Sequence, residues 1–135
     1  MTPEFTALLA QLEGLRAGVL KKLAGLSEDD ARRSTVPSGT NLAGLVQHLS
    51  FVETKWFEHK PGYGARSMTV DPSVSLRDLR ADYKAACDAS NNAVASGKFD
   101  EKRLRRALHA AINETARHCG HADIIREQID GQTGR

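Results

Sequence analysis

Three side chains that could bind one metal ion are spaced over two helical segments of the sequence. Glu114 and His118 stand four residues apart, so on a helix they project from one side about a turn apart. His48 follows Leu45 by three residues and precedes Val52 by four, which places it on the apolar face of another helix. Two imidazoles and one carboxylate, with positions left open, are typical of catalytic zinc sites and also fit iron, nickel or manganese.

The spacing of these residues leaves two interpretations open. A carboxylate directed into a helical bundle is costly unless it is paired or coordinates a cation, which favours a metal site formed by His48, Glu114 and His118. The alternative is that Glu114 and His118 form only a surface pair, worth about 0.2–0.5 kcal/mol.

Three further residues of this region have expected positions. His121 follows His118 by three residues and projects from the same side of the helix, whereas His109 falls on the opposite side and is expected in solvent. His59, at the exit of the earlier helix, is also expected to be exposed. Gly120 costs about 1 kcal/mol relative to alanine inside a helix, so we expect it to allow close approach of a neighbouring helix.

The two cysteines, Cys87 and Cys119, are far apart and fit no CxxC pattern. We expect two buried, reduced thiols, as is usual in the cytoplasm. Cys119 is turned about 100° from His118 on a helix, so packing is expected rather than nucleophilic chemistry.

Apolar residues recur at helical spacing in four stretches that must position these side chains. The first begins after Thr2-Pro3-Glu4, with a stripe from Phe5 to Leu23, and Ser27 begins a short helical turn. The second begins at Thr40 or Asn41 and ends near Glu58, the third runs from Ser75 to Ser96-Gly97, and the fourth runs from near Asp100 to Asp130-Gly131. Residues 59–74, which contain two prolines and two glycines, form a long connection.

Four amphipathic helices predict an all-α fold, a four-helix bundle with a long crossover between helices two and three. Residues 1–131 are expected to form a single domain, and residues 132–135 a short tail.

Composition excludes several other classes of protein. The chain has 135 residues and a formal net charge of +2, with basic and acidic residues interspersed, so no nucleic-acid binding is expected. No run of residues is apolar enough for a membrane span, and the N-terminal residues lack the pattern of a secretory signal. A cytoplasmic location is therefore expected.

Two blocks of the sequence carry a family resemblance. The first comprises LVQHL at 45–49 and VETKWF at 52–57; the second comprises ETARHCGHAD at 114–123, RE at 126–127 and DG at 130–131. Together they resemble the DinB-like (DinB/YfiT-like) superfamily, and more closely its actinobacterial branch related to mycothiol-dependent maleylpyruvate isomerase and mycothiol S-transferases.

The resemblance implies a four-helix bundle with a long crossover, often a homodimer. Relatives hold a divalent metal with one histidine of the second helix and two residues four apart on the last, which correspond here to His48, Glu114 and His118. His121 falls where many relatives carry glutamine, so the resemblance implies a substrate contact or a proton carrier rather than a ligand.

The expected activity is that of a metal-dependent thiol transferase or isomerase. A divalent metal, zinc or nickel by preference, would activate a low-molecular-weight thiol such as mycothiol for attack on an electrophile. Two alternatives use the same residues: a metal-dependent hydrolase, and a non-catalytic metal-binding stress or interaction protein.

Overall fold

In the computed structural model, which describes residues 1–60 and 67–134, all regular structure in these ranges is helical. Residues 61–66 of the expected crossover and Arg135 of the expected tail lie outside the described residues. The elements in chain order are α1 (Pro3–Val19), the 3-10 turn η1 (Leu20–Leu23), α2 (Glu28–Arg32), α3 (Leu42–Phe57), α4 (Leu76–Ala95) and α5 (Glu101–Asp130). The prediction of an all-α fold with four long helices is confirmed. No helix in the described ranges combines the length and the apolar composition that crossing a bilayer requires.

The boundaries of the long helices follow from capping side chains. Each first turn is closed by a side-chain oxygen that accepts a backbone N–H three residues on; the four caps are Thr2, Asn41, Ser75 and Asp100. Gly131 ends α5 with φ at 78°, a left-handed conformation that glycine adopts without steric cost. The sequence thus places all four starts and the last stop within a residue or two.

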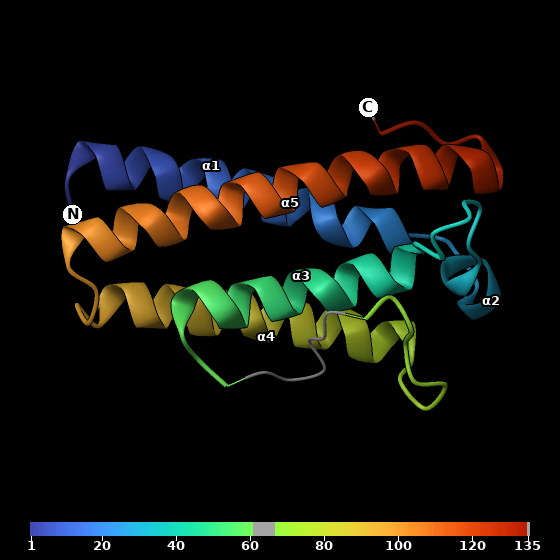
Figure 1. Ribbon diagram of the computed structural model, residues 1–135, viewed down its shortest axis with the longest axis horizontal. Helices are drawn as coiled ribbons and strands as arrows, with labels where there is room; N and C mark the ends of the chain where they lie inside the picture. The colour runs from blue at the N-terminus through green and yellow to red at the C-terminus, as the bar shows by residue number, and fades with distance from the viewer. Residues whose placement is uncertain (61–66, 135) are drawn as a thin grey trace.

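The long helices form a bundle in which two run in one direction and two in the other (Figure 1). Helices α1 and α5 run in one direction, and helices α3 and α4 run in the opposite direction. A parallel pair of consecutive helices requires a connection that returns along the bundle, which is why the chain between α3 and α4 is long.

The pairing of α3 with α5 sets the position of the candidate site. Leu45, Leu49 and Val52 of α3 share one apolar cluster with Ala122 and Ile125 of α5. A second cluster, nearer the start of α5, includes Phe57 and Leu108. The two helices run in opposite directions (Figure 1). His48 on α3 lies beside Glu114, near the middle of α5.

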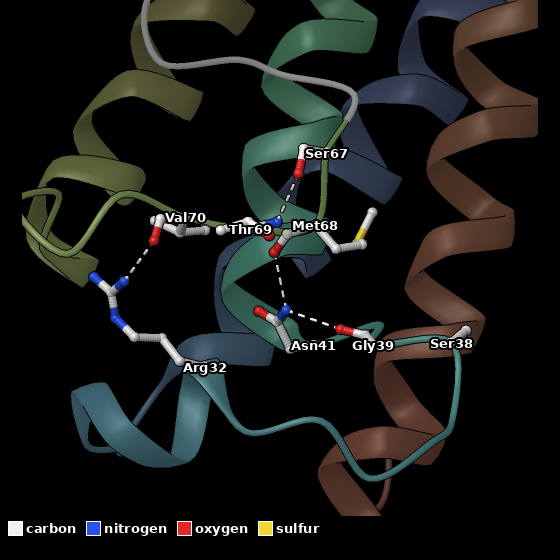
Figure 2. Close-up of a pocket in the computed structure, with 8 residues that line it drawn as sticks. All are labelled: Arg32, Ser38, Gly39, Asn41, Ser67, Met68, Thr69 and Val70. Atoms are coloured by element: carbon white, nitrogen blue, oxygen red, sulfur yellow. Dashed lines mark hydrogen bonds between the residues drawn. The ribbon is translucent and has the colours of Figure 1, made fainter.

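The part of the crossover that begins at residue 67 is hydrogen-bonded to the start of α3 (Figure 2). The Asn41 side chain donates to the carbonyl oxygens of Gly39 and Met68, at 3.1 and 2.9 Å. Gly44 makes room for this segment, since a Cβ there would lie 2.9 Å from the Met68 Cα. On the opposite side, Arg32 of α2 donates to the Val70 carbonyl at 3.1 Å. The Asn41 and Gly44 contacts hold the crossover against α3, which carries His48, and the Arg32 contact joins it to α2.

A buried ion pair connects α1 to α3. The Arg16 guanidinium donates to both carboxylate oxygens of Glu53, at 2.7 and 2.6 Å, and the two side chains are 4% and 1% exposed. Burial alone would lower the pKa of Arg16, but the bond to Glu53 raises it overall, so the cation persists. Arg16 also donates to the Asn91 side chain of α4 at 2.8 Å. Three helices therefore meet at one buried charge.

Breaking this pair should cost far more stability than breaking a surface pair. Arg16→Met leaves the Glu53 carboxylate buried without its partner, and we expect the free energy of unfolding to fall by about 3–5 kcal/mol. Arg105→Met, which breaks the exposed pair with Glu4, should leave that free energy nearly unchanged. Urea denaturation of both variants measures the difference. Equal losses would show that the buried pair does not hold the three helices together.

Candidate metal centre

His48 of α3 and the pair Glu114 and His118 of α5 converge as their spacing predicts. One potential ligand atom from each lies within 4.8 Å of the other two. The Glu114 Oε2 atom lies 3.2 Å from His118 Nε2 and 3.6 Å from His48 Nε2, so one carboxylate oxygen faces two imidazoles. The two rings stand edge to face with centroids 4.6 Å apart. All three side chains are partly buried, at the seam between α3 and α5.

The charges around Glu114 favour a bound cation. Among the described residues, no lysine or arginine forms an ion pair with this carboxylate, so a protonated imidazole or a bound cation is the counter-charge available to it. Burial, together with the neighbouring His48, lowers the pKa of His118 and thus disfavours its protonated form. A neutral imidazole is the form that binds a metal.

The second ring nitrogens of the two histidines have different environments. In His48, Nδ1 is buried and has no hydrogen-bond partner among residues 1–60 and 67–134. In His118, Nδ1 lies 3.4 Å from His121 Nδ1. Contacts to the second nitrogen orient a ligating histidine, so His121 is placed to orient His118. The donor types and their separation fit a divalent cation.

The other histidines lie away from this cluster, apart from His121. His109 is exposed, as expected. His59 is half-buried rather than exposed, because its Nε2 forms a 3.0 Å hydrogen bond with the Ser90 hydroxyl of α4. His121 is itself exposed and lines a pocket beside the cluster.

The expectation for Gly120 is wrong. A Cβ at this position would meet nothing within 4 Å, so no helix approaches it, and the residue lies on the exposed side of α5.

The cysteines are free and half-buried rather than fully buried. Burial, followed by the Glu53 carboxylate, raises the pKa of Cys87 to about 12, and burial also raises that of Cys119. Neither thiol is prepared to act as a nucleophile at neutral pH.

The wall of the pocket beside His121 has no counterpart among the residues expected from the sequence. The loop before α3 contributes Val36, Ser38 and Thr40, and α5 contributes Ile124 next to His121. The loop and the helix are more than 80 residues apart in sequence, so no local pattern links them. One signal was present: Ile124 and Ile125 are adjacent on a helix, and only one of the two can face the core.

Removing a cluster histidine should strongly weaken metal binding. We expect His118→Ala to weaken zinc or nickel affinity by at least about 100-fold, since losing a residue that only orients a ligand already costs about 10- to 100-fold. His109→Ala removes an exposed histidine of the same helix and should leave affinity unchanged. Competition with a chromogenic chelator measures both, and equal affinities in the two variants would contradict the assignment.

Metal affinity should fall as the pH is lowered from 7 toward about 5. Protons then compete for the imidazoles. Because the pKa of His118 is lowered, its ring stays neutral at pH values where an ordinary histidine is already protonated. The part of the affinity loss that is due to His118 is therefore expected near the lower end of this pH range. The same chelator competition at several pH values tests this. An affinity that is constant over the range would indicate binding to surface carboxylates, which stay ionised there.

Comparison with known proteins assigns the chain to a family. The family model described as mycothiol S-transferase matches residues 7–131, a range that contains all three cluster residues and His121. No curated protein and no solved structure matched the chain. The match covers most of the sequence and agrees with the helical bundle described above. The chain therefore belongs to the mycothiol S-transferase family, which is DinB-like.

Proposed function

We propose that this protein is a metal-dependent thiol transferase, which joins a low-molecular-weight thiol such as mycothiol to an electrophile. His48, Glu114 and His118 would hold the divalent cation, zinc or nickel. The observation that carries the proposal is the convergence of these three side chains within 4.8 Å in a member of the mycothiol S-transferase family.

The cation matters because of the ordinary acidity of thiols. A free thiol has a pKa of about 8.5 and is mostly protonated at neutral pH. A bound divalent cation would lower the pKa of a thiol that reaches it and so favour the thiolate form. Two imidazoles and one carboxylate leave coordination positions available to such a ligand.

His121 supports the reaction as a proton carrier and a substrate contact. It is the exposed imidazole that neighbours the cluster, with its Nδ1 3.4 Å from His118 Nδ1. As the thiol reacts, its S–H bond breaks, the proton passes to His121 or to water, and the sulfur electron pair forms the new S–C bond. An electrophile with a leaving group loses that group together with the electrons of its bond.

The protein's own cysteines are unsuited to replace the external thiol. Both are half-buried, and burial raises the pKa of each above the usual range. The nucleophile is therefore expected to be an external thiol substrate. This favours a transferase that uses a free thiol over a covalent mechanism through a protein cysteine.

Thioether formation should depend on both the thiol and the cluster. With monochlorobimane as the electrophile and mycothiol or N-acetylcysteine as the thiol, zinc- or nickel-loaded protein should form fluorescent thioether at least about 10-fold faster than the thiol alone. His48→Ala should return the rate to this background, whereas His59→Ala, a histidine just beyond the same helix, should keep it.

Two results would contradict the proposal. Equal rates for His48→Ala and the unaltered protein would remove the cluster from the reaction. Consumption of the electrophile with water rather than thiol in the product, identified by mass spectrometry, would favour the hydrolase instead.

A further inference from the structure

A pocket of about 410 Å³ lies beside His121, the neighbour of His118, between the loop that precedes α3 and the outer side of α5. Its wall comprises Val36, Ser38, Thr40, His121, Ile124 and Ile125. The volume falls in the range of small-molecule sites, which is roughly 300–1,000 Å³. His121 belongs both to this wall and to the surroundings of His118, so this one residue links the pocket to the centre.

The wall combines aliphatic side chains with a few polar groups and has no acidic, lysine or arginine side chain. Three of its six residues are aliphatic, two carry hydroxyls, one is a histidine, and no aspartate, glutamate, lysine or arginine is among them. Ile124 is 58% exposed, and apart from Met1 it is the one large hydrophobic side chain that is strongly exposed in the described ranges. Ile124 adds its aliphatic surface to that of Val36 and Ile125 in the same wall.

The loop side of the pocket is held in shape before any ligand arrives. The Ser34 hydroxyl lies 2.8 and 3.0 Å from the carbonyl oxygens of Val36 and Thr40, so its one hydrogen is shared between them or donated to either. The Gly39 N–H donates to the Val36 carbonyl at 3.1 Å. The Ser38 and Thr40 hydroxyls share a 2.9 Å hydrogen bond. Figure 2 shows the loop at Ser38 and Gly39 turning from α2 into the start of α3. A wall held by its own bonds loses little conformational entropy on binding.

We propose that this pocket binds the body of the electrophile, and that the preferred electrophile is an uncharged molecule with an apolar or aromatic group rather than a carboxylate or a phosphate. The inference rests on the proposed function, because it assigns the second substrate of that same reaction. An apolar group in the pocket gains from burial against Val36, Ile124 and Ile125, whereas an anion would be desolvated there with no cation in the wall to pair with it. The hydroxyls and His121 remain to hydrogen-bond a polar substituent.

The isoleucines allow a direct test of the pocket without metal or thiol. The chain has only four, at positions 112, 124, 125 and 129, so labelling their δ1 methyl groups gives four NMR signals. Metal-free protein is titrated with benzyl alcohol and, separately, with benzoate, which has a similar size and a negative charge. We expect saturable shifts of Ile124 and Ile125 with benzyl alcohol, at least about 10-fold weaker binding of benzoate, and no response from Ile112, which lies in the other apolar cluster.

A variant and its control complete the test. Ile124→Ser should weaken benzyl alcohol binding by about 10-fold, the lower end of the effect of one methylene in an apolar pocket. It should raise the KM for monochlorobimane in the same proportion. Ala116→Ser places a serine on the exposed side of the same helix, outside the pocket, and should change neither value.

Unmoved Ile124 and Ile125 signals, or equal binding of benzoate, would overturn the pocket assignment even if thioether forms at the metal centre. Saturable binding that Ile124→Ser weakens would uphold the assignment even if no thioether forms, in which case only the proposed transferase activity fails. The two hypotheses therefore fail separately.

Discussion

The Glu114 carboxylate, facing two imidazoles across a helix seam, is the constraint on which the rest of the structure depends. Its Oε2 lies within 3.6 Å of a ring nitrogen from α3 and another from α5, and no lysine or arginine in the described ranges forms an ion pair with it. A partly buried charge in this position requires a partner. The two helices must therefore pack in one register, because a shift by a single residue turns His48 about 100° away from Glu114.

That register is held by features distributed over the bundle. The buried pair of Arg16 and Glu53 joins α1 to α3 five residues beyond His48, and Asn91 adds α4 to the same charge. At the opposite end of α3, Asn41 and Gly44 hold the returning crossover against the helix. His48 is thus carried by α3, a helix in which most residues are buried, while the exposed His121 and Ile124 on α5 are left to meet a substrate.

Local patterns predicted much of this architecture. Capping residues and apolar stripes place the four helices, and the four-residue spacing of Glu114 and His118 brings both side chains to one face. Periodicity cannot predict contacts between distant polar residues, so the pair of Arg16 and Glu53 was missed, although each charge interrupts a helix with many apolar residues. The prediction that a neighbouring helix lies close to Gly120 was wrong, because the local sequence around a helical glycine is the same whether the glycine is exposed or lies where two helices cross. The hydrogen bond of His59 to Ser90 and the pocket formed by the loop at Val36 also depend on tertiary placement.

The most direct test of the account is X-ray absorption spectroscopy of the zinc-loaded protein, recorded before and after addition of thiol. We predict nitrogen and oxygen neighbours at about 2.0–2.2 Å in the first spectrum, from His48, Glu114, His118 and water, and one additional sulfur neighbour at about 2.3 Å in the second. Sulfur in the spectrum before any thiol is added would implicate the protein's own cysteines. No sulfur at saturating thiol would show that the cation does not activate the thiol, and would contradict the central claim.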